Sequence, residues 1–180
     1  MTIFEMVFNL IGLVLGLALV EVLGGLARTI KSRPEQRVGW LTPLLGAWVV
    51  LDVSAFWGIA WEVRDLLTTL WPSLLVGVLL ASTYFLAAAL IFPNDIENQP
   101  DPDAHYWATK RKVIGLVLFC DLTVLVLVQL LGRTPSTWVI AINALYFSTI
   151  IVALIARGRT TNMALLGALI AIMTAGFLTP

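Results

Sequence analysis

Three acidic residues lie inside long apolar stretches of this 180-residue sequence: Glu21, Asp52 and Asp121. A charged side chain at the centre of a transmembrane helix costs roughly 2.5–3.5 kcal/mol on insertion scales, so such residues normally face protein or water. No lysine or arginine is near Asp52 or Asp121 in the sequence. Each of these two groups must therefore be protonated, solvated, bound to a cation or hydrogen-bonded by neutral donors. Proton relays and cation sites in membranes use such carboxyl groups.

The composition indicates which elements must position these residues. Hydrophobic residues make up 59% of the chain and charged residues 12%, whereas soluble domains have about 45–50% and about 25%. The formal net charge of zero argues against nucleic acid as a partner. Cys120 is the single cysteine, so neither a disulfide within the chain nor a cysteine zinc site is possible. This composition is typical of a chain that has a bilayer as its solvent.

Six apolar stretches predict an all-α, polytopic transmembrane bundle that forms a single domain over residues 1–180. Each stretch approaches the ~20 residues that a helix needs to cross the hydrocarbon core. The predicted helices span about residues 3–27, 42–61, 72–92, 113–131, 136–156 and 163–178. Residues 11–15 resemble residues 114–118, which raises a 3+3 inverted repeat as one design. The alternative is chance similarity among the commonest residues of membrane helices.

The basic residues predict the orientation of the bundle. Nine of the eleven lysines and arginines lie in the first, third and fifth connections, and Arg64 and Arg133 lie on the opposite side. Because positive charges favour the cytoplasmic side, these three connections are predicted to be cytoplasmic and both termini to be outside. The nine are Arg28, Lys31, Arg33, Arg37, Lys110, Arg111, Lys112, Arg157 and Arg159.

Asp52 and Asp121 are predicted to lie at a similar depth near the middle of the membrane. Both predicted helices start from the cytoplasmic side, and each aspartate follows eight to ten residues later. If the two carboxyl groups meet, they titrate as a coupled pair. The alternative is two separate carboxyl groups that strengthen helix packing through neutral hydrogen-bond partners. The candidate partners are Tyr84, Asn143, Ser54, Thr83 and Thr123.

Glu21 has two interpretations. Arg28 follows seven residues later, about two turns along the same helix face, so the two residues are candidates for an ion pair that fixes packing, directly or through a bridging residue. Glu21 is also a candidate ion- or proton-binding neighbour of the two aspartates, with Arg28 as a supporting polar residue. The sequence leaves both open.

The third connection is the one long polar segment, at residues 93–109. Its prolines prevent a continuous helix, and Asp103 can cap a helix that restarts there. His105, Tyr106 and Trp107 follow as candidate loop and interface residues, with the two aromatic side chains at headgroup level and Lys110–Lys112 at the cytoplasmic surface. The simpler interpretation is an interfacial anchor, and the alternative is a gating or partner-binding element.

These observations predict a small multi-pass protein of a bacterial-type inner membrane that conducts protons or small cations through Asp52 and Asp121. The chain has one histidine and lacks the P-loop, the HExxH motif and the Gly-x-Ser-x-Gly elbow, so we expect no enzyme activity, no cofactor and no metal site. Besides lipid, the expected partner is a second copy of the chain in a homodimer. The alternative is a non-catalytic accessory or assembly subunit of a larger membrane complex.

Overall fold

The computed structural model describes residues 3–31, 39–66, 70–93, 103–132 and 135–178. Within these residues it is helical and contains no strand. The elements are α1 (Ile3–Lys31), α2 (Leu41–Glu62), the 3-10 turn η2 (Arg64–Leu66), α3 (Leu70–Ala89), α4 (Ala104–Leu130), α5 (Thr137–Ile155) and α6 (Arg159–Leu178). All six α-helices are long and apolar enough to cross a bilayer. The predicted all-α bundle of six candidate transmembrane helices is therefore confirmed.

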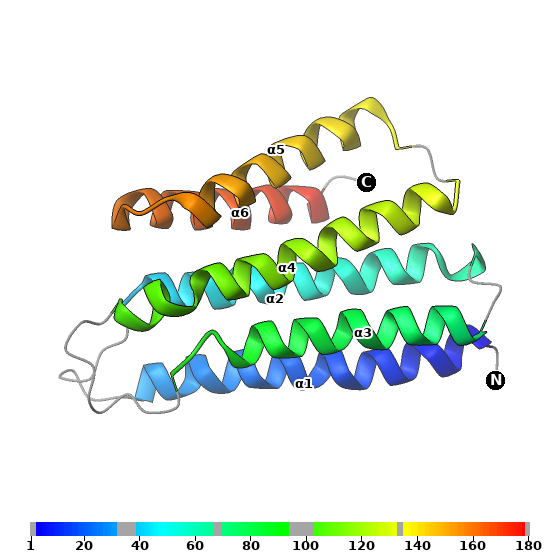
Figure 1. The fold of residues 1–180 in the computed structure, drawn as a ribbon, viewed down its shortest axis with the longest axis horizontal. Helices are drawn as coiled ribbons and strands as arrows, with labels where there is room; N and C mark the ends of the chain where they lie inside the picture. The colour runs from blue at the N-terminus through cyan, green and yellow to red at the C-terminus, as the bar shows by residue number, and fades with distance from the viewer. Residues whose placement is uncertain (1–2, 32–38, 67–69, 94–102, 133–134, 179–180) are drawn as a thin grey trace.

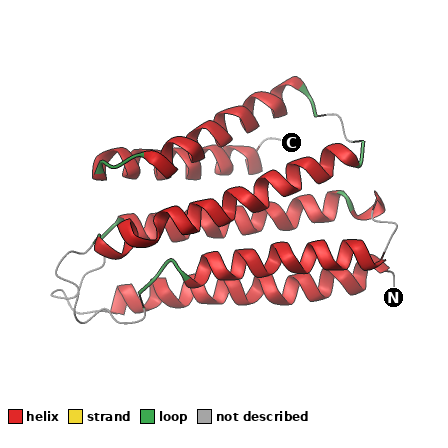
Figure 2. Ribbon diagram, viewed as in Figure 1, coloured by secondary structure: helices red, strands yellow, loops and turns green. Residues whose placement is uncertain are grey.

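The helices run roughly along one direction in three pairs (Figure 1). Helices α1 and α3 form one edge of the bundle, α2 and α4 lie in the middle, and α5 and α6 form the other edge. Helix α2 packs on α1, α4 and α6, whereas α4 packs on α3 and α5. The helices begin and end at the two ends of the bundle (Figure 2). The middle helices, which carry Asp52 and Asp121, are thus covered on both sides.

The structure does not show the 3+3 inverted repeat. In such a repeat, the contact between α1 and α3 would have its counterpart between α4 and α6. Helices α1 and α3 pack closely, but α4 and α6 make no comparable contact in the described part of the chain. The short similarity between residues 11–15 and 114–118 is therefore not accompanied by matching helix packing.

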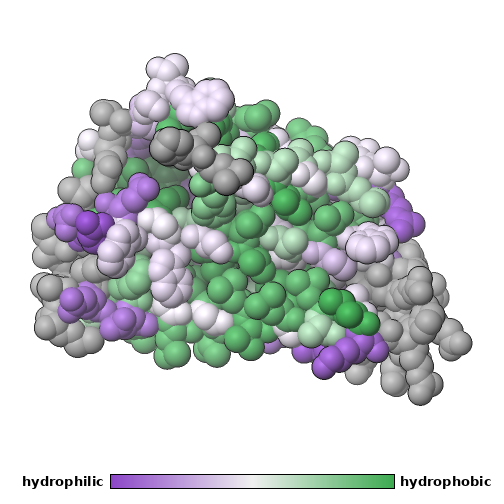
Figure 3. Space-filling view, turned by 180° about the vertical axis from the view of Figure 1, so that it is seen from behind, coloured by the Kyte–Doolittle hydropathy of each residue, from purple (hydrophilic) through white to green (hydrophobic). Residues whose placement is uncertain are grey.

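Apolar side chains face outward as well as inward, as a membrane solvent allows. Leu13, Val126 and Ile155 are among the large hydrophobic residues that are more than half exposed. Apolar residues dominate the middle of the face in Figure 3, and hydrophilic residues lie toward its ends. In water this surface would be unfavourable by about 25 cal/mol per Å² of apolar area, but hydrocarbon removes that penalty.

The predicted boundaries agree with the structure within a few residues, except in α4. This helix begins at Ala104 rather than at residue 113. Its first two turns are polar, so hydropathy alone placed the start after the basic run. Asp103 takes the N-cap position as predicted, but its side chain makes no capping hydrogen bond. Its carboxylate instead lies 3.0 Å from Nε of Arg159 at the start of α6.

Glycine allows α1 to approach its neighbours closely. A Cβ atom at Gly25 would overlap the ring of Phe92, which follows α3, whereas a Cβ atom at Gly16 would meet nothing within 4 Å. Phe92 is itself buried. Gly25 is therefore required by packing, and Gly16 is not.

Candidate functional site: a carboxyl–tyrosine cluster

Asp52 lies on the buried face of α2 and is only 3% exposed. Trp48 one turn before it and Phe56 one turn after it are also buried, as their spacing of four residues on a helix requires. The Phe56 ring packs against that of Tyr84 on α3, with centroids 5.5 Å apart. The aspartate is thus held in an aromatic environment between the middle helices and their neighbours.

Asp52 and Asp121 meet through two tyrosine hydroxyl groups. The Tyr84 hydroxyl donates to Oδ2 of Asp52 at 2.8 Å and lies 3.4 Å from Oδ1 of Asp121. The Tyr146 hydroxyl donates to Oδ1 of Asp52 at 2.5 Å and lies 3.4 Å from Oδ2 of Asp121. We call these four residues the carboxyl–tyrosine cluster. The helices α2, α3, α4 and α5 contribute one residue each.

The two tyrosine hydroxyl groups have two hydrogens for four contacts with carboxyl oxygens. Each tyrosine has one hydroxyl hydrogen and two lone pairs, so it can donate to one carboxyl group and accept from the other. The short contacts assign both hydroxyl hydrogens to Asp52. The two longer contacts then join hydroxyl oxygens to carboxyl oxygens of Asp121. A proton on Asp121 would give one of these contacts the hydrogen that it otherwise lacks.

No basic side chain pairs with either carboxyl group in the described part of the chain. Two carboxylates in one low-dielectric site repel each other, and burial disfavours both charges. The cluster compensates only with neutral hydroxyl donors. A shared proton is the simplest way to satisfy this arrangement.

Trp48 adds a further polar atom near Asp52. Its side chain is 0% exposed, and its indole N–H interacts with the Tyr146 hydroxyl group without forming a hydrogen bond of good geometry. Buried polar groups are nearly always paired, so this donor has room for a better acceptor beside the cluster. An indole N–H can only donate, so it suits an acceptor such as water and does not suit a cation.

The other predicted partners of the aspartates bind elsewhere. Ser54, Thr83 and Thr123 each donate to the backbone carbonyl four residues earlier in their own helix. Asn143 is half-buried on α5, but no hydrogen bond joins it to the cluster. Of the five neutral candidates, Tyr84 alone contacts the two carboxyl groups.

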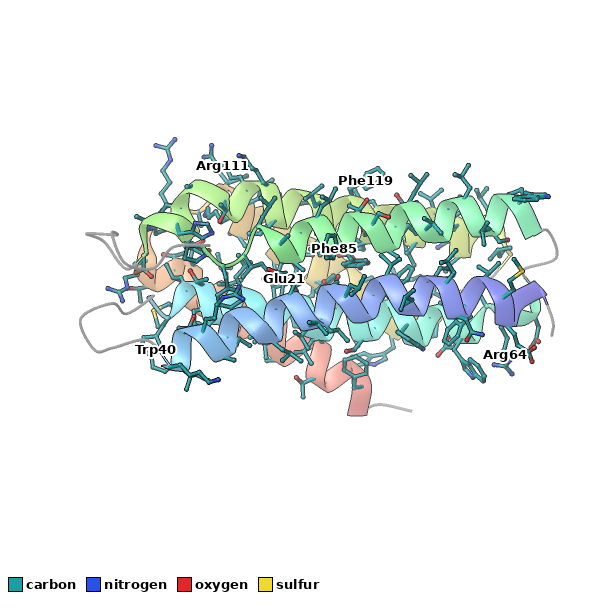
Figure 4. All side chains as sticks on the ribbon, turned by 90° about the horizontal axis from the view of Figure 1, so that it is seen from below. Glu21, Trp40, Arg64, Phe85, Arg111 and Phe119 are labelled. Carbon is teal, nitrogen blue, oxygen red and sulfur yellow. The ribbon has the colours of Figure 1, made fainter. Side chains whose placement is uncertain are left out.

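Glu21 and Arg28 contact each other and not the cluster. Arg28 Nη2 lies 3.8 Å from Glu21 Oε1, and both side chains are more than a third exposed. The direct pair makes a bridging residue unnecessary. An exposed pair at this distance contributes little, typically 0–1 kcal/mol. Figure 4 shows Glu21 on α1, toward the end of the bundle where Trp40 lies.

The segment expected at the membrane interface is partly buried. His105 contacts the Leu90 carbonyl through Nε2 at 3.1 Å, and Trp107 is half-buried. Tyr106, however, is 0% exposed and donates to Oδ1 of Asn162 on α6 at 2.8 Å. Its side chain therefore faces the bundle interior, because the rotation of α4 about its axis directs residue 106 inward, and its depth at headgroup level stays a prediction.

Lys110 also departs from its expected position at the surface. It is 3% exposed, whereas the neighbouring Arg111 and Lys112 are exposed. A run of three basic residues on a helix covers almost a full turn, so one of them must point inward when one face is buried. Arg33, Arg37 and Arg133 lie outside the described residues.

Tyr146 and Asn162 are the site residues that the sequence analysis missed. Tyr146 lies midway along α5, so its hydroxyl group could have been predicted to hydrogen-bond the two aspartates. Asn162 is 0% exposed near the start of α6, where polar residues commonly face solvent. No sequence pattern distinguished it from an ordinary helix-terminal residue.

No protein-family model matches this chain, and comparison with curated proteins and with solved structures finds no significant match.

Proposed function

We propose that this chain is a small multi-pass membrane protein that carries protons across the bilayer through the carboxyl–tyrosine cluster. The single observation that supports this function is the pair of buried carboxyl groups, Asp52 and Asp121, bridged by the hydroxyl groups of Tyr84 and Tyr146. Ionisable groups in membrane helices are costly and usually functional. A pair with two bridging hydroxyls is more elaborate than helix packing requires.

The donors around the carboxyl groups favour protons over metal cations. Two hydroxyl groups donate to Asp52, so its oxygens are already hydrogen-bonded. The described residues contain no group of three or more His, Cys, Asp or Glu side chains that could hold a metal ion. The Trp48 N–H adds a donor near the site. Hard cations take about six or more oxygen ligands, whereas both carboxyl oxygens of Asp52 already accept hydroxyl hydrogens.

Proton transfer through a bridging tyrosine balances without an ionised phenol. As a protonated Asp121 gives its hydrogen to the hydroxyl oxygen of Tyr146, the original O–H bond of that tyrosine breaks and its hydrogen passes to Asp52. Tyr146 stays neutral, Asp121 becomes the carboxylate and Asp52 becomes the acid. The same exchange through Tyr84 gives a second route.

We place the chain in a bacterial-type inner membrane, and the positive-inside rule supports an orientation with both termini outside. The end of the bundle near Trp40 and Arg111 would face the cytoplasm, and the end with Arg64 would face outward (Figure 4). Of the described basic residues, Arg28, Lys31, Arg157 and Arg159 also lie at helix ends or connections of the proposed cytoplasmic side.

Proton flux into liposomes tests the proposal with isosteric variants. Asp52→Asn and Asp121→Asn keep the side-chain shape but remove the titrating group, so we expect each to reduce flux at least tenfold, which corresponds to about 1.4 kcal/mol. Glu21→Gln is the matched control, because Glu21 is also a carboxylate on a transmembrane helix but contacts Arg28. Unchanged flux in both aspartate variants would overturn the proposal. A stoichiometric larger partner in a mild-detergent pull-down would then support an accessory subunit.

A further inference from the structure

Lys110 is buried at the end of α5, where three acceptors match its three ammonium hydrogens. Its Nζ donates to the Ala153 carbonyl at 3.0 Å, to Oδ1 of Asn162 at 2.9 Å and to the Ala156 carbonyl. Asn162 also donates through Nδ2 to the carbonyls of Ala156 and Gly158, at 3.2 and 2.7 Å. Lys110 thereby joins α4 to the turn between α5 and α6.

The charge of Lys110 is balanced by dipoles and π-electrons, since no described carboxylate pairs with it. The partial negative charge at the α5 C-terminus lies at the two carbonyls that it binds. The Trp107 ring centroid lies 5.1 Å from Nζ. Burying an ammonium in this way is expensive compared with an apolar residue of similar length. If residue 110 only stabilised helix packing, methionine or leucine would do so without the cost of burying a charge.

A stripe of buried apolar residues on α4, Ile114 and Val117, lies between Lys110 and the carboxyl–tyrosine cluster. Lys110 and Asp121 are eleven residues apart, about three turns and roughly 16 Å along the same face of α4. Ile114 and Val117 lie between them and are 0% exposed. On α5, Ile150 is likewise 0% exposed between Tyr146 and Ala153. From the cluster to the Lys110 end, α4 and α5 are therefore sealed by side chains.

The other half of the same helices has few fully buried side chains. No described residue of α4 after Cys120 is buried, and none of α5 before Tyr146. In α6 the last buried residue is Leu169. Asp121 itself is mostly buried but keeps some exposed surface, whereas Asp52 behind it is fully buried. The cluster therefore lies between a half of these helices that has a buried stripe and a half that has none among the described residues.

We propose that Lys110 and Asn162 form a closed gate on the cytoplasmic side of the carboxyl–tyrosine cluster, which leaves the cluster accessible from the outer side. This inference rests on the proposed function, since it describes how that site is reached. The gate bonds run from one side chain to two helix-end carbonyls and one amide. A small rotation of α4 would break them without breaking a backbone hydrogen bond of either helix.

Thiol accessibility tests the gate without any flux measurement. Val117 lies on the sealed stripe, and Val117→Cys in a Cys120→Ser background gives one reporter between Lys110 and Asp121. A small cationic methanethiosulfonate is added to the cytoplasmic face of membrane vesicles. We expect slow labelling with Lys110 present and at least tenfold faster labelling after Lys110→Met. Lys112→Met is the matched control, because Lys112 is exposed in the same helical turn.

Asn162→Ala keeps the lysine and removes one acceptor, so it tests the gate if Lys110→Met fails to fold. It too should accelerate labelling of the reporter from the cytoplasmic face at least tenfold. An unchanged labelling rate in a folded gate variant overturns the gate, whatever the flux. If Asp52→Asn and Asp121→Asn leave proton flux unchanged, the proposed function is overturned instead. The two failures are therefore distinguishable.

Discussion

Tyr146 on α5 donates its hydroxyl hydrogen to Asp52 on α2 across 2.5 Å, the shortest oxygen–oxygen contact in the carboxyl–tyrosine cluster. The same hydroxyl oxygen lies 3.4 Å from Asp121 on α4. One phenol thus touches both carboxyl groups and ties three helices together. Its removal should affect both the packing of the bundle and the proposed proton path.

The variant Tyr146→Phe should lower proton flux about tenfold and destabilise the protein by about 1–3 kcal/mol. The aspartate would lose a donor while staying buried, which is the costly way to break a hydrogen bond. Tyr84→Phe should have the smaller effect, because its contact with Asp52 is longer, at 2.8 Å. Flux in liposomes and thermal unfolding in detergent measure the two effects.

A double-mutant cycle of Tyr146→Phe and Asp52→Asn tests whether the two residues act together in proton flux. If Tyr146 acts through Asp52, the effects of Tyr146→Phe and Asp52→Asn on flux are strongly non-additive, because Asp52→Asn already removes the route that Tyr146 serves. Additive effects would show that the tyrosine and the aspartate act independently.

The sequence was sufficient for the architecture and for three of the four cluster residues, Asp52, Asp121 and Tyr84. Hydropathy and the ~20-residue span length define the six helices, because every lipid-facing backbone must be hydrogen-bonded within its own helix. Asp52 and Asp121 could be placed at one depth by counting residues from the starts of the apolar stretches at residues 42 and 113. Their contact through shared hydroxyls needed the helix arrangement, since residue counting gives depth and no information about which faces meet.

Lys110 shows most clearly what residue counting misses. Three successive basic residues looked alike, and the positive-inside rule assigned all of them to the surface. The rotation of α4 about its own axis decides which one turns inward, and that rotation is set by packing against α3 and α5. Two of the three acceptors of Lys110 are backbone carbonyls at the end of α5, which carry no sequence signature.

Replacing Gly25 with alanine should destabilise the protein by about 1–3 kcal/mol, the usual cost of overpacking. The added Cβ atom would overlap the ring of Phe92, which is 6% exposed and has little room to move. Gly16→Ala in the same helix is the control, with nothing within 4 Å of its Cβ position. Alanine favours helix by up to about 1 kcal/mol over glycine, so this control should be neutral or stabilising. Equal unfolding temperatures for the two variants would contradict the packing of α1.

Cysteine labelling in intact cells tests the proposed orientation of the bundle. Asp65 in η2 and Thr160 in the first turn of α6 are both exposed and lie on opposite sides in the proposed topology. In a Cys120→Ser background, a membrane-impermeant thiol reagent should label Asp65→Cys in intact cells. It should label Thr160→Cys only after the membrane is opened. The reverse pattern would invert the topology, place the Lys110–Asn162 gate on the outer side, and show that the nine basic residues do not set the orientation as the positive-inside rule requires.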